Sequence, residues 1–317
     1  MRIAAAAAAM GIALVLAEAG LRLARYRESP LTIKEGRAAA RNDWRGHHAF
    51  KDKRFTADPV LIWKPKPSEG VFNSAGFRGR ELAVEKRAGE VLVFAVGDSN
   101  TLGWDEVDGP NWPSYLEEFL RGDIPGVVVE NAGVIGYSSF QGLGRLAEAL
   151  GFSPDMVLIS FGANDAHLVA VADADFAEHR QADLSRLRLL RLVAALRNRA
   201  RGKGNLVHRV GLDRYKRNLR EMVSLARQAR AVPVLLTRPF VGGRGDDPLW
   251  WMYHADAYVE ATREVAREAG TPLIDLHVPF KDRADLFADE SHFNEQGHRL
   301  AARLIHRDIS RLLVDRR

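Results

Sequence analysis

The chain of 317 residues contains no cysteine. This absence excludes disulfide bonds, thiolate zinc sites, iron–sulfur clusters and a cysteine nucleophile, and it leaves the redox compartment undetermined. The sequence also shows no internal repeat, no nucleic-acid recognition motif and no histidines at metal-ligand spacing. We therefore expect no metal, no other cofactor and no nucleic-acid partner. Hydrophobic residues make up 46% of the chain and charged residues 27%, which is typical of a large α/β domain with an appendage.

No apolar run at the N-terminus is clearly long enough for a membrane-spanning helix of about 20 residues. Residues 3–17 are uninterrupted Ala, Leu, Val, Ile, Met and Gly, a length typical of a signal-peptide core, and Ala17-Glu18-Ala19 resembles a cleavage site. If Glu18 lies at the membrane interface, the run extends to Leu23 as an uncleaved anchor. We predict a signal peptide or anchor over residues 1–25 and membrane association through residues 3–23. An Ala-rich surface helix is the alternative.

This N-terminal segment predicts an exported or membrane-anchored protein, in the periplasm or elsewhere outside the cytoplasm. Three arginines follow the apolar run closely, whereas only Arg2 precedes it. The positive-inside rule would keep the flank with more arginines in the cytoplasm, so the charges oppose this orientation.

The net charge of +5 is unevenly distributed. Residues 180–220 contain 13 Lys or Arg and 2 Asp or Glu, so the basic excess is local. It lies largely in an Arg-rich stretch, about residues 173–210, which we interpret as an insertion. A helix is expected over residues 184–196, although its arginines and leucines do not separate onto opposite faces. The segment is either a solvated or partly docked helix or a binding surface for an anionic partner such as membrane headgroups.

The chain divides into three predicted parts: the leader, a polar lead-in or stalk over residues 26–90, and an α/β domain over residues 91–317. Short aliphatic runs within the domain are typical of strands buried on both faces of a parallel sheet. They alternate with helical patterns, which predicts a three-layer α/β/α fold with right-handed crossovers. The expected strands are 91–96, 127–130, 156–161, 234–237 and 273–276, and the expected helices are 112–121, 138–150, 212–230, 254–269 and 294–313.

Ser99 follows the first strand in the order Gly97-Asp98-Ser99. Its hydroxyl is expected at the C-terminal end of that strand, where parallel α/β folds bind ligands. A serine hydroxyl attacks poorly unless a base removes its proton, so a catalytic role requires a histidine. The motif lacks the second glycine of G-x-S-x-G, which disfavours an α/β-hydrolase elbow. Taken alone, Gly-Asp-Ser also fits a turn with a helix cap.

Asn164, in the motif Gly162-Ala163-Asn164-Asp165, follows the third strand. Its side-chain amide is a neutral donor of the type that holds the negative charge of an acyl transition state. Gly133, after the second strand, offers a backbone N–H with no side chain in the way, although a simple turn glycine is nearly as good an interpretation. The candidate oxyanion donors are therefore the amides of Ser99 and Gly133 and the side chain of Asn164.

Asp289 and His292 lie three residues apart, just before the last helix. A local loop can hold the carboxylate against one imidazole nitrogen and leave the other facing Ser99. The candidate catalytic residues are therefore Ser99 as nucleophile, His292 as base and Asp289 as the group that orients the base. His298 is a rival base, but its position in the final helix predicts a side chain that points away from the sheet edge.

These motifs, in this order, resemble the SGNH or GDSL hydrolase family of esterases and lipases over about residues 91–313. The four name-giving residues of the family match Ser99, Gly133, Asn164 and His292. The resemblance implies a flavodoxin-like five-stranded sheet of order 2-1-3-4-5 and a metal-free acyl-serine mechanism. Many members carry Leu or an aromatic residue at the position of Asn100, whereas Asn recurs in some carbohydrate and aryl esterases.

The segments 61–67 and 73–79 also resemble a bacterial membrane-anchored or exported subset of that family. We therefore expect a serine esterase that hydrolyses a small oxygen ester, with O-acetyl groups on a glycan as a candidate substrate. Two alternatives remain open. The same site could transfer the acyl group to an envelope polysaccharide, or the chain could be a non-catalytic glycan- or membrane-binding module.

Overall fold

Contacts in the computed structural model divide the chain into two compact units. One comprises residues 1–44 and 169–207, and the other comprises residues 45–168 and 208–317. The structure describes residues 2–24, 53–58, 60–68, 70–83, 86–103, 109, 111–169, 171–183, 188–189, 207–241, 255–289 and 291–314. The helix expected over residues 184–196 therefore lies outside the described residues, apart from positions 188 and 189.

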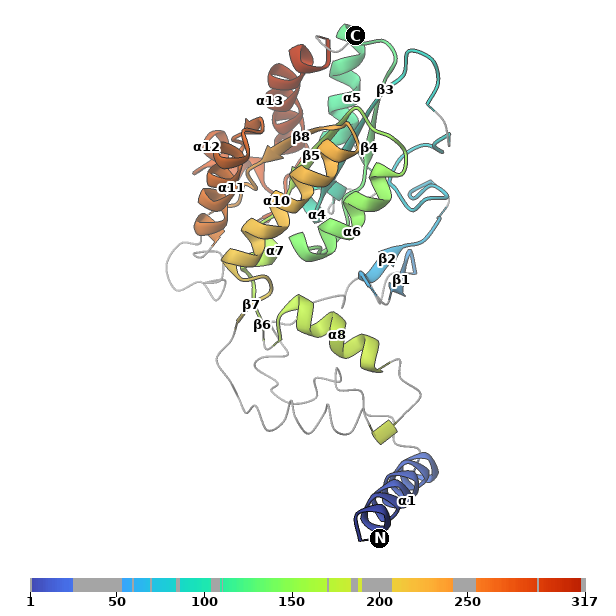
Figure 1. Cartoon of the computed structure of the whole chain (residues 1–317). Coiled ribbons are helices and arrows are strands. Elements are labelled where there is room, and N and C mark those ends of the chain that lie inside the picture. Colours follow the sequence, from blue (N-terminus) through green and yellow to red (C-terminus); the bar gives the residue numbers. More distant parts are fainter. Residues whose placement is uncertain are drawn as a thin grey trace. The chain divides into compact units, whose positions relative to one another are not determined.

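The larger unit is built on a parallel five-stranded sheet (Figure 1). Its strands are β3 (Val91–Gly97), β4 (Val127–Asn131), β5 (Met156–Ser160), β8 (Val232–Leu236) and β9 (Leu273–Ile274). The order across the sheet is β4-β3-β5-β8-β9, with every neighbouring pair parallel. This order confirms the expected 2-1-3-4-5 arrangement. Every residue of β3, β4 and β5 is buried, as expected for aliphatic runs covered on both faces.

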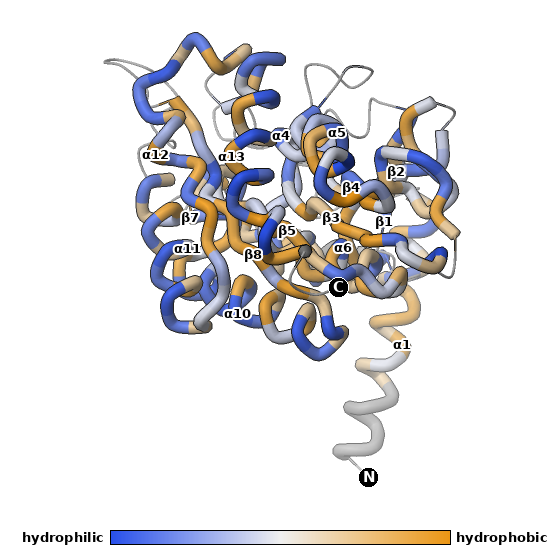
Figure 2. Tube along the Cα trace, turned by 90° about the horizontal axis from the view of Figure 1, so that it is seen from above, coloured by the Kyte–Doolittle hydropathy of each residue, from blue (hydrophilic) through white to orange (hydrophobic). Residues whose placement is uncertain are grey.

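Five amphipathic helices cover the sheet. They are α5 (Trp112–Asp123), α6 (Ser139–Leu150), α10 (Leu212–Gln228), α11 (Ala255–Ala269) and α13 (Glu295–Val314). Helices α5 and α13 pack together on one face, and α6, α10 and α11 pack side by side on the other. Figure 2 shows the hydrophobic strands of the sheet between helices whose outward-facing residues are mainly hydrophilic. The three-layer α/β/α prediction is confirmed, and the five expected strands and the five expected helices that flank them are present to within two residues at either end.

Short elements mark the C-terminal edge of the sheet. Helix α4 (Ser99–Leu102) follows β3, α7 (Ala163–Ala166) follows β5, and α12 (His277–Phe280) with the 3₁₀-helix η2 (Ala284–Leu286) precedes the final helix. The chain therefore turns sharply after several strands, and it is in these turns that the predicted site residues lie.

The lead-in segment packs against the sheet unit. Strand β1 (Phe55–Asp58) pairs antiparallel with β2 (Ile62–Pro65). The side chain of Trp63 is fully buried, and its indole N–H donates to the carbonyl of Ile135 at 3.0 Å. The Tyr137 hydroxyl donates in turn to the Trp63 carbonyl at 2.5 Å. Trp63 of this segment thus supports the loop after β4.

The smaller unit contains helices α1 (Arg2–Leu23) and α8 (Asp173–Asp183). Strand β6 (Leu168–Val169) pairs with β7 (Val207–His208) where the chain passes between the two units. The Glu18 carboxylate accepts hydrogen bonds from the backbone N–H groups of Arg188 at 3.0 Å and Leu189 at 2.7 Å. The end of α1 and the Arg-rich insertion are therefore in contact within this unit. Within the described part of the chain, no helix combines the length and apolarity needed to span a bilayer.

Candidate active site

The predicted catalytic residues converge on one edge of the sheet. Ser99 follows β3 and begins α4, and Asn164 lies in α7 directly after β5. Asp289 and His292 lie in the turn between η2 and α13. Because β3 and β5 are parallel neighbours, their carboxyl ends meet at the same edge, which is the usual ligand site in such sheets.

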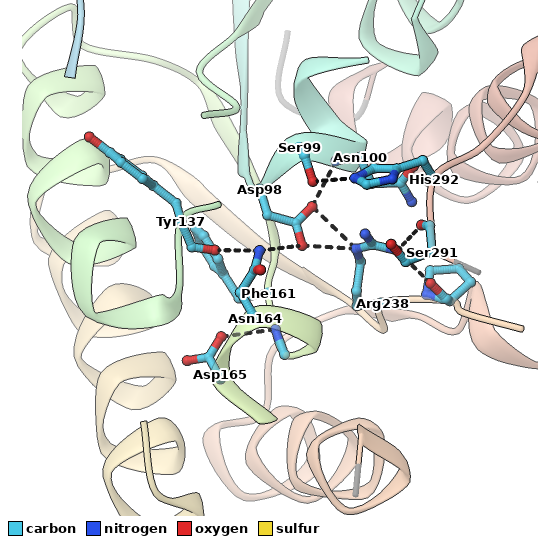
Figure 3. A network of polar contacts seen from close by, with 12 residues as sticks. Asp98, Ser99, Asn100, Tyr137, Phe161, Asn164, Asp165, Arg238, Ser291 and His292 are labelled. Atoms are coloured by element: carbon cyan, nitrogen blue, oxygen red, sulfur yellow. Dashed lines mark hydrogen bonds and ion pairs between the residues drawn. The ribbon is translucent and has the colours of Figure 1, made fainter. Parts of the chain in front are cut away.

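A continuous chain of contacts joins the three predicted catalytic side chains. The Ser99 hydroxyl oxygen lies 2.8 Å from His292 Nε2 (Figure 3). The other ring nitrogen, Nδ1, lies 2.6 Å from Asp289 Oδ2. Asp289 Oδ1 accepts the backbone N–H groups of Ser291 at 2.7 Å and His292 at 2.8 Å. A carboxylate held in this way fixes the tautomer that presents an unprotonated Nε2 to the serine.

The environment of Asp289 keeps its carboxylate ionised. Partial burial acts to raise its pKa, but the hydrogen bond and charge of His292 and the two backbone N–H donors outweigh burial. The pKa of Asp289 is therefore held well below its usual range. An ionised Asp289 can stabilise the imidazolium that forms when His292 takes a proton.

The local sequence explains why Ser99 faces this site. Asp98 is the N-cap of α4, and its side chain accepts the Asn100 backbone N–H at 2.9 Å. Ser99 is consequently the first residue of a helix, where backbone N–H groups lack an intrahelical acceptor and can face an anion. Gly97 is required by close packing, because a side-chain carbon there would lie 2.8 Å from the Ser160 carbonyl oxygen.

Two of the predicted oxyanion donors already donate hydrogen bonds to other groups of the protein. Asn164 Nδ2 donates to the Tyr137 carbonyl at 3.0 Å, and it lies 3.5 Å from Asp98 Oδ2 (Figure 3). The backbone N–H of Gly133 donates to the side chain of Asn131 at 2.9 Å. An acyl oxygen would have to displace that internal contact to use the Gly133 amide. The oxyanion role of Gly133 stays a prediction.

The rival base His298 is part of the protein interior. Its side chain is buried, and Nδ1 accepts the Trp112 backbone N–H at 3.3 Å. Burial, reinforced by nearby arginine charges, lowers the pKa of His298 to about 3. Its ring packs edge-on against Phe293, so His298 supports the turn that carries His292.

Sequence reasoning missed three groups that touch the site. The Tyr137 carbonyl orients Asn164, the Asn100 side chain accepts the Phe293 backbone N–H at 3.0 Å, and Arg238 pairs with Asp98. A backbone carbonyl leaves no mark in a sequence. Arg238 did leave a signal, because it is a basic residue two positions beyond the end of a buried strand.

The chain is similar in sequence to known proteins. Residues 95–300 match the GDSL-like lipase/acylhydrolase family. An arylesterase from Vibrio mimicus is 36% identical over 85 residues, which cover 26% of this chain and 42% of that protein. The chain is thus aligned with less than half of the length of that curated relative.

Solved structures share the fold. Axe2, an acetylxylan esterase from Geobacillus stearothermophilus, is 24% identical with a TM-score of 0.50, and the match covers 70% of this chain and 94% of that one. LAE5, an alpha/beta hydrolase enzyme from the metagenome of Lake Arreo in Spain, is 22% identical with a TM-score of 0.50, over 71% and 96% of the two chains. At these identities the likeness is one of fold alone.

The chain belongs to the GDSL-like lipase/acylhydrolase family, because the family match covers well over half of it. The resemblance drawn from Ser99, Gly133, Asn164 and His292 is thereby confirmed at the level of the family. The family is one of lipases and acylhydrolases, which are enzymes that act on ester bonds.

Proposed function

We propose that the protein is a serine esterase that hydrolyses small oxygen esters through an acyl-enzyme at Ser99. The observation that carries the proposal is the contact chain from the Ser99 hydroxyl through His292 to Asp289, at 2.8 and 2.6 Å. These distances lie within the range at which a base can remove the hydroxyl proton. A module that only binds a ligand has no need of this arrangement.

The reaction follows from the geometry in two halves. Ser99 Oγ attacks the ester carbonyl carbon while His292 Nε2 takes the hydroxyl proton. The resulting tetrahedral intermediate expels the alcohol, which receives that proton, and leaves an acyl group on Ser99. Water then attacks the acyl carbon, His292 removes a proton from the water, and the acid leaves as the proton returns to Ser99.

Negative charge on the former carbonyl oxygen requires donors aimed at it. We assign this role to the backbone N–H of Ser99, the side-chain amide of Asn164 and the backbone N–H of Gly133. The side chain of Asn164 is held in place by the hydrogen bond that its Nδ2 donates to the Tyr137 carbonyl. The Gly133 amide becomes available when its contact with Asn131 opens. Each such donor typically stabilises the transition state by about 3 kcal/mol.

The proposed substrate is a short acyl ester, with O-acetyl groups on a glycan as the leading candidate. Support comes from Asn100 beside the nucleophile, which recurs in some carbohydrate and aryl esterases of the family. Here Asn100 has a structural task, because its side chain accepts the Phe293 backbone N–H. A panel of p-nitrophenyl esters of increasing chain length tests the preference, and a preference for long acyl chains would contradict it.

The decisive experiment uses Ser99→Ala in parallel with the wild-type protein. The variant is expected to lose hydrolysis of p-nitrophenyl acetate and labelling by a fluorophosphonate probe, while circular dichroism and the melting temperature stay unchanged. Activity retained by the folded variant would remove Ser99 from the mechanism. Product analysis with and without a glycan acceptor separates hydrolysis from acyl transfer, because a transferase yields acylated glycan in excess of free acid.

We also propose that residues 3–23 direct the protein to a membrane or for export. Support comes from α1, where large apolar side chains such as Val15 and Leu16 are 69% and 66% exposed. Fractionation of cells expressing the full chain, followed by sequencing of the mature N-terminus, tests both outcomes. Recovery of the intact chain in the soluble cytoplasmic fraction would contradict the proposal.

A further inference from the structure

Arg238 joins the segment that carries Ser99 to the segment that carries His292. Its Nε donates to both carboxylate oxygens of Asp98, at 3.2 and 3.0 Å. Its Nη1 donates to the carbonyl of Ser291 at 2.8 Å (Figure 3). One side chain therefore holds the residue before the nucleophile and the residue before the base.

A second contact runs between the same two segments. The Asn100 side-chain oxygen accepts the backbone N–H of Phe293 at 3.0 Å. Asn100 follows Ser99 directly, and Phe293 follows His292 directly. The neighbours on both sides of the nucleophile are thus tied to the neighbours on both sides of the base, and the 2.8 Å contact between the two catalytic side chains lies between these ties.

The position of Arg238 in the fold makes it suited to this task. It follows β8, whereas Asp98 follows β3, and β5 lies between those strands in the sheet. The guanidinium group thus spans the C-terminal end of the intervening strand. Arginine presents several donors in a rigid planar fork, so it can bond a carboxylate and a carbonyl at the same time. A lysine ammonium is a single point charge and cannot reproduce both arms in the same geometry.

Charge is the second reason to expect a functional effect. The side chains of Asp98 and Arg238 are 1% and 3% exposed. Without its partner, the Asp98 carboxylate would be a buried anion next to Ser99 in the chain, beside the site proposed for the oxyanion. Arg238 neutralises that carboxylate, so the oxyanion forms beside a balanced pair.

We propose that Arg238 is a positioning residue that fixes the distance and alignment between Ser99 and His292 by clamping Asp98 to Ser291. This inference rests on the proposed function, since it concerns how the same site is kept ready to react. Arg238 contacts neither catalytic side chain in the described structure and acts through their neighbours. Loss of the clamp leaves the substrate site in place but loosens the hydrogen bond needed for proton transfer.

The test compares Arg238→Met, Arg238→Lys and a control, Arg263→Met. Arg263, on α11, pairs with the carboxylate of Asp275 at 2.8 Å and also with Glu260. Removing it therefore controls for the loss of an arginine–carboxylate pair near the same sheet edge. Each variant is first checked for folding by circular dichroism and urea unfolding.

Steady-state kinetics with p-nitrophenyl acetate gives the first result. A misalignment of about 1 Å can lower a rate by about 100-fold, so Arg238→Met is expected to lower kcat by about that factor with little change in KM. Arg238→Lys keeps a charge beside Asp98 but loses the second arm, so an intermediate kcat is expected. The control is expected to match the wild type. Wild-type kcat in folded Arg238→Met would overturn the proposal.

Two further readouts do not depend on ester turnover. The rate of fluorophosphonate labelling at Ser99 should fall in Arg238→Met and not in the control. The downfield proton NMR signal of the hydrogen bond between His292 and Asp289 should broaden or disappear in the same variant. If the wild type fails to hydrolyse every ester, the proposed function fails, and the NMR signal still decides whether Arg238 orders this turn. An unchanged signal in folded Arg238→Met would then refute the clamp.

If Arg238→Met does not fold, the test uses Arg238→Lys and Asn100→Ala. Asn100→Ala removes the hydrogen bond between the Asn100 side chain and the Phe293 backbone N–H, and it leaves the pair of Arg238 and Asp98 intact. Both are expected to lower kcat more than they raise KM. A loss of activity in Arg238→Lys that only follows its folded fraction would make Arg238 a purely structural residue and would overturn the assignment.

Discussion

Glu130 places a carboxyl group in the interior, and this makes a sharp prediction about stability. It lies on β4 opposite Phe94 of β3 and is 1% exposed. Within the described part of the chain, its Oε2 has no hydrogen-bond partner. The lead-in segment closes over it, because a side-chain carbon at Gly79 would lie 2.7 Å from that oxygen. Burial, with the nearby charge of Glu117 as a second cause, raises the pKa of Glu130 from 4.5 to about 8.

The sign of the effect follows from proton binding. The folded chain holds this proton more tightly than the unfolded chain, so stability falls as the pH rises. The contribution is fully present below about pH 4.5 and is lost as the pH rises through about 8. The difference between the two pKa values corresponds to at most about 5 kcal/mol in the free energy of unfolding.

Glu130→Gln tests this reasoning, because glutamine has the same shape and carries no charge at any pH. Urea unfolding at several pH values between 5 and 9 should show a smaller loss of stability for the variant than for the wild type. Glu118→Gln, at an exposed position on α5, is the matched control and should follow the wild type. Parallel pH dependences for the wild type and Glu130→Gln would refute the assignment of a protonated buried carboxyl group.

Three further substitutions test the site and its supports. Gly133→Ala would place a methyl group against the backbone of α4, so it should reduce both the fluorophosphonate labelling of Ser99 and the melting temperature. Gly122→Ala is the control, because no atom lies within 4 Å of the added carbon, and it should change neither. Equal behaviour of the two variants would count against the close-packing argument. Tyr137→Phe removes the hydrogen bond from the Tyr137 hydroxyl to the Trp63 carbonyl and should lower the free energy of unfolding by about 1–3 kcal/mol in urea titrations, and an unchanged midpoint would contradict that value. Asp289→Asn should lower kcat by about 10⁴ through loss of the correct tautomer, and a loss of less than tenfold in stopped assays would disprove the orienting role.

The sheet was predictable from the sequence because its signal is strong and local. Runs such as 91–96 and 156–161 are short and almost entirely apolar, as is typical of strands covered on both faces. Helix boundaries also left signals, as at Pro113 in the first turn of α5; the N-cap itself, Asn111, accepts the Ser114 backbone N–H at 3.2 Å. The strand order came from the family resemblance, since periodicity alone does not order strands.

The residues that could react were also predictable, because each stands at the end of a strand or the start of a helix. Their supports were not predictable, because those contacts are long-range. Arg238 is 140 positions from Asp98, and Trp63 is 72 positions from Ile135. No periodic pattern links such pairs, and a hydrogen bond to a backbone carbonyl places no demand on residue type at the accepting end.

The packing of Trp63 and its neighbours has a practical consequence for anyone who shortens the gene. A fragment trimmed to the family match at residues 95–300 would lose β1, β2, most of β3 and most of α13. It would expose Tyr137 and uncover Glu130, so we would expect poor yield and weak activity from a polypeptide that still contains every catalytic side chain. Expression should begin upstream of Lys53 and include all of α13, to at least Val314.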